Sequence, residues 1–448
     1  MRLSHLFLFT SSFFSIFALA TRWRQGHPCP ESIKTVLPNS DRPLDENENG
    51  HTFDSMVAVH EALTTCPNIS SLDLRVTLMG CSSWPDRFNF PFRLAGGERY
   101  PALKELRLEG YNFDERPWEK LALGKSYGLP WYESLTEWLL SGTARKWWNA
   151  RALDIDQRNK TNLDLWLDAM DWSHLEALAV LDRPLPLKDV PRLRSLEKLD
   201  LSGSDVENAR EVIQTLPSQS LTSLTIVRSA EMLELETILS HQGKSLTVLE
   251  LRSPEVQSKP SPAFNISELQ FLPQLAPNLQ HLSINVHRNG SWPLGTLEAI
   301  STNPSLRSVD IWFDIVSECR RQKPEAPHIR DVRKWEATHG VDACNGEDQY
   351  QRPYIDQSSS LELFRYMRVK KIGQELANVT FWVGDWTRAW DGPLYFADWL
   401  EHRRSKVSCS IRAEGGEEGW CVVEDGKEYW KRGKYWDWGG DDDYDMVD

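Results

Sequence analysis

The sequence has little positive charge and no long hydrophobic run beyond its first twenty residues. Its 448 residues include 51 Lys and Arg against 65 Asp and Glu, which gives a formal net charge of −14. The negative electrostatic field of such a chain repels nucleic acid, which is therefore disfavoured as a partner. After residue 20 no segment approaches the roughly 18 uninterrupted apolar residues of a membrane-spanning helix, so we expect no membrane span.

Motifs for several common chemistries are also missing. The sequence contains no phosphate-binding glycine turn, P-loop or G-x-S-x-G motif, and its cysteines lack the spacing of a zinc site. The segment VHEAL at 59–63 begins like the zinc-protease motif H-E-x-x-H, but Thr64 stands where the second His is required. Paired carboxylates could serve glycoside hydrolysis, yet here the repeat pattern alone places acids on neighbouring strands. We therefore expect neither an enzyme nor a bound cofactor or metal.

A short apolar pattern recurs along the chain. In LRSLEKLDLSGSDV (193–206), Leu196, Leu199 and Leu201 lie three and then two residues apart. This spacing indicates a turn that leads into a short strand with one apolar face. The pattern occurs ten times, beginning at residues 69, 103, 150, 175, 196, 221, 246, 279, 306 and 376. Five of the nine intervals between these positions fall within the roughly 20 to 29 residues of a leucine-rich repeat.

The segments between the repeats predict helices. Prolines stand just before several repeats, as in CPNI and APNL, where they end a helix. Apolar residues at helical spacing favour helices at 52–63, 205–216, 230–240 and 294–302. We expect an α/β fold, a leucine-rich-repeat solenoid (horseshoe) with a parallel inner sheet, outer helices and disulfide-stapled caps. The alternative is an ordinary doubly wound sheet, whose strands are longer and continuously apolar.

The ends of the chain differ from the repeats. Arg2, a stretch rich in Leu and Phe, and then Ala18 and Ala20 predict a secretory signal cleaved after Ala20, and hence a secreted, extracellular protein. The expected organisation is a signal peptide at 1–20, a leader and cap at 21–68 that is irregular to residue 50, a solenoid at 69–383 with insertions at 112–149 and 313–375, a C-terminal cap with a hairpin at 384–435, and an acidic tail at 436–448.

An exported chain is expected to oxidise its cysteines. Of the seven cysteines we expect Cys319 to pair with Cys344, Cys409 with Cys421, and Cys66 with either Cys29 or Cys81. Five N-x-S/T sequons occur, and the glycosylation candidates are Asn68, Asn159, Asn265 and Asn289. We leave out the fifth, Asn378, because it falls on a repeat strand.

The repeat pattern also predicts a binding surface. The residue between the second and third apolar positions faces solvent, and it is acidic in five of the ten repeats. Acidic side chains with aromatic anchors suit a protein partner. The predicted partner-binding residues are Asp200, Glu250, Arg252, Asp310, Trp312 and Trp382. The alternative is a solvated sheet face whose charges only prevent association.

The sequence contains twenty tryptophans, and the 112–149 insertion is rich in them. Because aromatic rings stack on sugar rings, Trp147 and Trp148 are candidates for a carbohydrate-binding site, with a cell-wall polysaccharide as the alternative ligand. Large aromatic side chains also fill the irregular joints between a solenoid and its caps, which is the structural explanation for the same residues.

The irregular repeat lengths and the proline lead-ins resemble the leucine-rich-repeat superfamily, in particular its F-box-associated and ribonuclease-inhibitor-like branch. The segments GYNFDERPW (110–118), NLDLWLDAMDWSHLEAL (162–178) and YFADWLEHRRSKVSCS (395–410) are similar to segments of fungal F-box-like repeat proteins. The resemblance covers residues 69–383 and implies a protein-binding scaffold. Intracellular members carry an F-box before the repeats, where this chain has the predicted signal peptide. An intracellular ubiquitin-ligase adaptor is thus the third interpretation.

Overall fold

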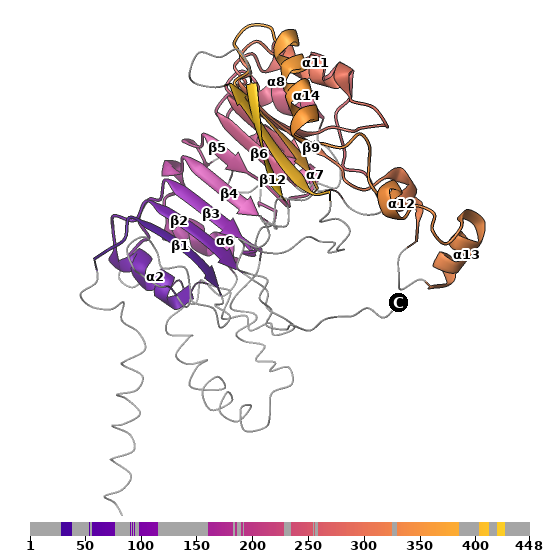
Figure 1. The fold of residues 1–448 in the computed structure, drawn as a ribbon. Coiled ribbons are helices and arrows are strands. Elements are labelled where there is room, and N and C mark those ends of the chain that lie inside the picture. The colour runs from indigo at the N-terminus through magenta and orange to yellow at the C-terminus, as the bar shows by residue number, and fades with distance from the viewer. Residues whose placement is uncertain are drawn as a thin grey trace, which may run out of the picture. The chain divides into compact units, whose positions relative to one another are not determined.

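A computed structural model of the chain (Figure 1) describes nine of the ten predicted repeats and both ends of the repeat series. The described residues are 28–37, 53, 56–76, 90, 92, 94, 98–114, 160–181, 184–185, 190, 192–227, 234–253, 255, 259–324, 329–384, 403–411 and 419–425. Several predictions lie outside these residues, namely the signal peptide, the sequon at Asn159, Cys81, the repeat beginning at residue 150, and Trp147 and Trp148.

The chain divides into two compact units. Unit one comprises residues 1–204 and 215–217, and unit two comprises residues 205–214 and 218–448. Their described residues contain twelve strands, which lie in chain order within each unit. The architecture is α/β with mostly parallel strands, as the sequence predicts.

Unit one is built on five parallel strands. Its elements are β1 (Ser32–Leu37), α2 (Met56–Thr65), β2 (Ser71–Val76), β3 (Glu105–Glu109), α6 (Asn162–Ala169), the 3-10 helix η4 (Trp172–His174), β4 (Ala177–Leu181) and β5 (Lys198–Asp200). The strands align repeat on repeat, since Leu72 pairs with Leu106 and Asp73 with Arg107. Apolar and polar residues therefore form separate rows across the sheet.

Unit two continues the same pattern and ends with an antiparallel pair. Its elements are α7 (Val206–Thr215), β6 (Ser223–Val227), α8 (Leu235–Gln242), β7 (Val248–Arg252), α9 (Ile266–Gln270), α10 (Leu272–Leu275), β8 (His281–Asn285), α11 (Leu294–Ser301), β9 (Ser308–Phe313), α12 (Glu318–Gln322), α13 (Ile329–His339), η6 (Gly346–Gln349), α14 (Gln357–Lys370), β10 (Asn378–Val383), β11 (Ser405–Ile411) and β12 (Gly419–Asp425). Strands β6 to β10 are parallel, whereas β10, β11 and β12 pair antiparallel.

Alternation of apolar and polar residues explains the strands. Leu249, Leu282, Val309 and Val379 occupy equivalent places in β7 to β10 and have no exposed surface. Burying such a side chain contributes about 1.5 to 3 kcal/mol, more than a short strand gains from its own backbone. The stacked apolar row is thus what holds each strand in the sheet.

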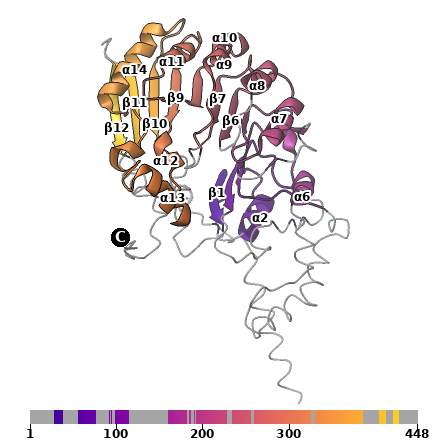
Figure 2. The same ribbon diagram turned by 90° about the vertical axis from the view of Figure 1, so that its right-hand side faces the viewer.

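Helices cover one face of the strands in unit two (Figure 2). The predicted helices at 205–216, 230–240 and 294–302 correspond to α7, α8 and α11. In α7 the buried residues are Ala209, Val212 and Ile213, spaced as one helical stripe that packs on the core. Across the described segments, every helix is too short or too polar to span a bilayer.

Strand β1 is not predicted by the repeat pattern, which indicates irregular chain at residues 21–50. Thr35 occupies the place of an apolar residue, and its hydroxyl donates a hydrogen bond of 3.1 Å to the carbonyl of Phe53. Ile33 pairs with Leu72 in parallel register and is fully buried. In the same register Pro28 corresponds to Pro67 of the CPNI lead-in, a sequence feature that could have revealed the strand.

The described residues contain three disulfides. Cys319–Cys344 and Cys409–Cys421 confirm the predicted pairs, and Cys66 pairs with Cys29, one of its two expected partners. The Cys29–Cys66 bond ties the chain before β1 to the end of α2, and the Cys409–Cys421 bond joins β11 to β12. Disulfides therefore fasten the first and last described strands to their neighbours.

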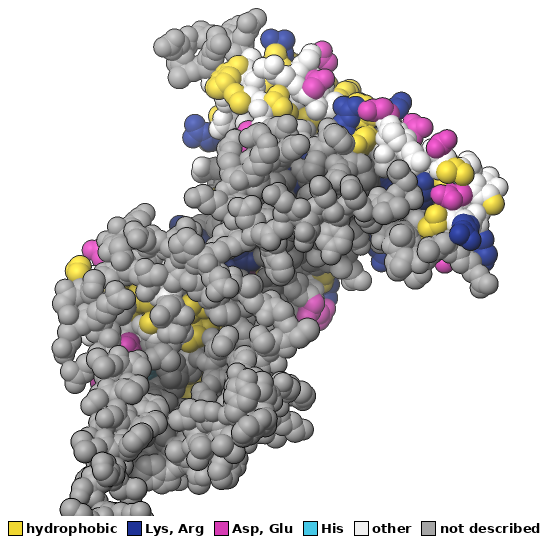
Figure 3. Space-filling model, turned by 60° about the horizontal axis from the view of Figure 1, so that its bottom comes forward, with side chains coloured by type: hydrophobic (Ala, Val, Ile, Leu, Met, Phe, Trp, Pro, Cys, Tyr) yellow, Lys and Arg dark blue, Asp and Glu magenta, His cyan; other side chains and the backbone are white. Residues whose placement is uncertain are grey.

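The long interval at 313–375 has its own structure. Helices α12 and α13 lie beyond the ends of the strands of unit two (Figures 1 and 2), and the Cys319–Cys344 bond links α12 to the chain just after α13. On this projecting segment, at the right in Figure 3, Lys and Arg side chains lie beside Asp and Glu side chains. Helix α14 then returns to the sheet, where its Gln357 donates a 2.8 Å hydrogen bond to the carbonyl of Cys421.

Candidate functional site

The sheet face of unit two opposite the helices brings together five of the six predicted partner-binding residues. Strand register aligns Asp310 with Ser283 and Thr380, and Trp312 with Asn285 and Trp382. Glu250 aligns with Ser283, and Arg252 follows in the same strand. Two rows result, a carboxylate row of Glu250, Ser283, Asp310 and Thr380, and an aromatic row that begins with Arg252.

The aromatic row forms a stack, which we call the tryptophan ladder (Arg252, Trp312, Trp382 and Lys406). The two indole rings are parallel within 1°, with centroids 4.5 Å apart. The Arg252 guanidinium carbon lies 3.8 Å from the centroid of Trp312, and the Lys406 ammonium lies 4.7 Å from that of Trp382. Each outer ring face therefore carries a cation, an arrangement worth about 0.5 to 2 kcal/mol per contact.

A short side chain makes the ladder continuous. Arg252 is on β7 and Trp312 on β9, so the guanidinium must pass over Asn285 of β8. The Asn285 carboxamide oxygen accepts a 2.7 Å hydrogen bond from the backbone N–H of Ser253, which holds this side chain against the sheet. The Trp312 indole N–H donates to the Ser283 hydroxyl at 3.0 Å, which fixes the ring plane.

Carboxylates hold both ends of the ladder. Glu250 lies 2.6 Å from Arg252, and Glu424 lies 3.5 Å from Lys406. Each cation of the ladder is therefore paired with a carboxylate, and the ladder has an acidic side chain at both ends.

Lys406 and Glu424 are not among the predicted residues. Alternation from the core residue Cys409 puts Lys406 on this face, but apolar alternation does not reveal which residue of β10 it meets.

Asp310 lies at the centre of the carboxylate row. Its carboxylate is 3.7 Å from the His281 imidazole and forms a hydrogen bond with Thr380. Burial raises the pKa of Asp310, and His281 opposes that shift. A half-buried acid of this kind attracts a cationic group and is costly to leave unpaired in a dry interface.

A buried ionic cluster anchors the chain just after β9. Glu255 accepts hydrogen bonds from the backbone N–H groups of Ile315 and Val316, at 2.6 and 2.7 Å. The Arg321 guanidinium contacts Glu255 and also Asp314, the latter at 3.1 Å. Burial and the neighbouring Asp314 raise the pKa of Glu255 to about 8. The cluster therefore fixes the chain directly after β9, just before the projecting segment that contains α12 and α13.

Asp200, the sixth predicted residue, belongs to unit one and has a structural environment of its own. It accepts a hydrogen bond from the backbone N–H of Ser202 and lies 3.9 Å from Arg107. Arg107 also lies 3.6 Å from Asp73 and 3.9 Å from Glu109. Asp200 is thus one acid of a charge network across β2, β3 and β5 of unit one.

Neither protein-family models nor curated protein sequences give a match to this chain.

Proposed function

We propose that the chain is a secreted leucine-rich-repeat protein without catalytic activity, which binds a protein partner through the tryptophan ladder and carboxylate row of unit two. The observation that carries this proposal is the register of β7 to β11, which gathers Arg252, Trp312, Trp382 and Lys406 into one row beside Glu250 and Asp310. Tryptophan and arginine supply much of the energy of protein interfaces, and flanking acids select the partner.

The ladder favours a protein over a carbohydrate. A sugar ring stacks on an open aromatic face, but here the inner ring faces contact each other and the outer faces contact Arg252 and Lys406. The ring edges and the polar groups around them remain for a ligand. Carbohydrate binding through Trp147 and Trp148 is the alternative, and those residues lie outside the described segments.

The disulfides support secretion over the intracellular adaptor interpretation, because such bonds persist in oxidising compartments. Asn68, Asn265 and Asn289 have exposed side chains, as attachment of a glycan requires. Expression in a eukaryotic secretory host, with mass analysis of medium and lysate before and after removal of N-glycans, tests this part of the proposal. Glycosylated protein cleaved after Ala20 supports it, and uncleaved, sugar-free protein in the lysate contradicts it.

Binding is tested with a photo-crosslinking amino acid at Thr380, in the carboxylate row, and at Glu236, on the helix side, as the matched control. We expect a protein crosslinked from Thr380 only. Its capture should fall with Asp310→Lys or Glu250→Lys, more strongly at low salt, and with Trp382→Ala. Equal crosslinking from both positions, or capture that none of these variants reduces, contradicts the proposal. Loss of capture with Trp147→Ala or Trp148→Ala alone would favour the carbohydrate alternative.

A further inference from the structure

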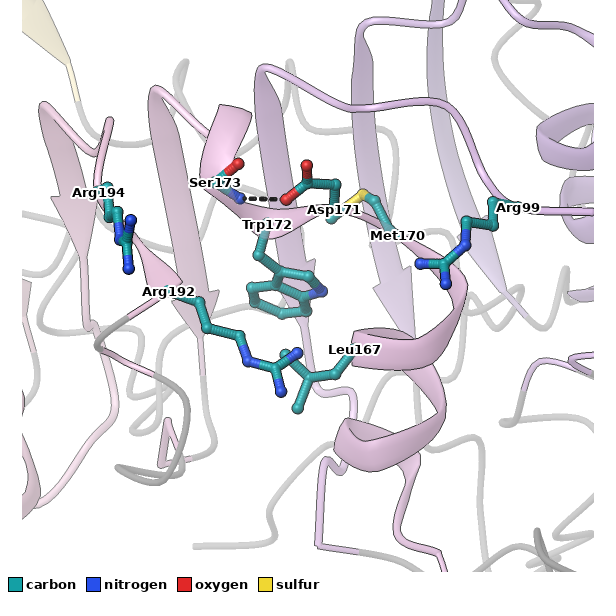
Figure 4. Close-up of a pocket in the computed structure, with 8 residues that line it drawn as sticks. All are labelled: Arg99, Leu167, Met170, Asp171, Trp172, Ser173, Arg192 and Arg194. Atoms are coloured by element: carbon teal, nitrogen blue, oxygen red, sulfur yellow. Dashed lines mark hydrogen bonds between the residues drawn. The ribbon is translucent and has the colours of Figure 1, made fainter.

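A separate cleft in unit one combines an apolar floor with a basic rim (Figure 4). Its volume is about 430 Å³, within the size range of small-molecule sites. The cleft lies where the chain enters three successive strands, since Arg99 precedes β3, Trp172 precedes β4, and Arg192 precedes β5. Parallel strands begin at one edge of a sheet, so these entry turns meet.

The floor is apolar and fixed in place. Leu167, Met170 and Trp172 are 7%, 1% and 3% exposed. The Trp172 indole N–H donates a 3.2 Å hydrogen bond to the carbonyl of Trp166 in α6, which turns the polar atom of the ring towards the protein. The small part of the residue that stays exposed, 3%, belongs to the floor of the cleft.

The rim carries three arginines and one acid. Arg99, Arg192 and Arg194 are exposed, and Figure 4 shows Arg99 reaching the cleft from the side opposite to Arg192 and Arg194. Among the described lining residues Asp171 is the one acid, so three positive charges and one negative charge leave an excess of two there. Asp171 accepts a 3.0 Å hydrogen bond from the backbone N–H of Ser173 and lies 3.3 Å from His174. The Ser173 hydrogen bonds lower the pKa of Asp171, and the charges of His174 and Arg99 add to that shift.

The basic cleft stands out in this chain because the chain as a whole carries a charge of −14, which repels anions elsewhere on the surface. The long-range field repels anions, so an anion is retained only where guanidinium groups contact it directly. The planar guanidinium fork matches the oxygens of carboxylate, sulfate and phosphate.

We propose that this cleft binds a small ligand through an oxyanion group, held by Arg99, Arg192 and Arg194, with a ring or other apolar part of the ligand on Trp172, Leu167 and Met170. The site is independent of the protein-binding face proposed for unit two.

Calorimetric titration of the full chain tests the site with phenyl phosphate, inorganic phosphate and phenol. We expect phenyl phosphate to bind more tightly than inorganic phosphate, because only it covers the apolar floor, and phenol to show no measurable binding. Phenyl sulfate and benzoate in the same titration distinguish the oxyanion that the site prefers. Phenol that binds as well as phenyl phosphate, or no binding by any of the anions, overturns the proposal.

Variants assign the binding to these residues. Arg192→Ala, Arg194→Ala and Arg99→Ala should each weaken phenyl phosphate binding, by about tenfold for a direct contact. Asp171→Asn keeps an acceptor for Ser173 and should strengthen it about threefold, because a nearby negative charge is removed. Lys34→Ala, which removes an 82% exposed cation on β1, is the matched control and should change nothing. Because the arginines are exposed, we expect their alanine variants to keep the fold. An affinity that all three alanine variants leave unchanged overturns the assignment.

Discussion

The indole rings of Trp312 and Trp382 lie face to face on neighbouring strands, with centroids 4.5 Å apart. The two residues align in the parallel register of β9 and β10. Both rings lie on the sheet face opposite the core, where Trp312 is 8% exposed and Trp382 is half-buried, so the contact buries much of the surface of both. The stack therefore contributes to stability as well as to the shape of the proposed binding face.

The two tryptophans should be energetically coupled. Trp312→Ala should lower the free energy of unfolding by about 3 to 5 kcal/mol, and Trp382→Ala by roughly half as much because its ring is only half-buried. Denaturant unfolding of both single variants and the double variant gives the coupling. We expect the double variant to lose about 1 kcal/mol less than the sum, since either change alone removes the stacking. Simple additivity would show that the ring contact contributes nothing.

The charge network of unit one depends on Arg107, which approaches Asp73, Glu109 and Asp200. Arg107→Ala should lower the free energy of unfolding by about 1 kcal/mol. The reason is that Asp73, Glu109 and Asp200 all lose the attraction of this guanidinium group. Urea unfolding at two salt concentrations checks this, and the loss should be smaller at high salt. Lys34→Ala is the control, since Lys34 is 82% exposed and 4.0 Å from Asp73. Equal effects from both variants would contradict the assignment to Arg107.

The buried Glu255 should make stability depend on pH. Its pKa is raised from 4.5 to about 8 by burial and by Asp314. The folded protein therefore binds this proton more tightly than the unfolded chain does. The resulting stabilisation is complete below the unfolded value and is lost as pH rises through about 8. Denaturant unfolding at a series of pH values should show the free energy of unfolding of the wild type falling as pH rises from 4.5 to about 8.

Glu255→Gln supplies the comparison for that pH profile. The amide keeps an oxygen for one of the backbone donors at Ile315 and Val316, and it cannot titrate. We expect the fall in stability with rising pH to be smaller in this variant, and Arg321 to pair with Asp314 alone. Identical pH profiles for wild type and variant would show that Glu255 does not carry the effect.

Each disulfide should stabilise the chain by an amount that rises slowly with the length of the loop that it closes. The Cys29–Cys66 bond spans 37 residues and the Cys409–Cys421 bond spans 12. Replacing each pair by alanine should cost about 4 and about 3 kcal/mol respectively, because the longer loop gains more freedom in the unfolded chain. Thermal or denaturant unfolding of the oxidised proteins measures both losses. A larger loss for the Cys409–Cys421 pair would indicate that native contacts in the hairpin outweigh loop entropy.

Most strands could be predicted from the sequence because burial alone specifies them. Val309 and Ile311 must face the core, which leaves Asp310 and Trp312 on the opposite face. The same reasoning places Glu250, Arg252 and Trp382. Neighbouring repeats then bring these residues together, since parallel strands stack without an offset.

Contacts between unlike elements could not be predicted in this way. Lys406 meets Trp382 because of the antiparallel register of β10 and β11, which no apolar row specifies. The repeat pattern does not predict strand β1 because Thr35 stands where the pattern requires an apolar residue. Thr35 can be buried there because its hydroxyl donates a hydrogen bond to the carbonyl of Phe53. The arginine-lined cleft comes from entry turns, where side chains are exposed and their sequence is unconstrained by the core.

The reversal of chain direction at β11 and β12 limits how this protein could grow by internal duplication. A repeat copied between β7 and β8 would find parallel neighbours on both sides and would extend the apolar rows by one member. A copy placed after β12 would meet an antiparallel strand that a disulfide already ties to β11. Gains and losses of whole repeats among descendants of this chain should therefore fall inside the series and leave the hairpin in place.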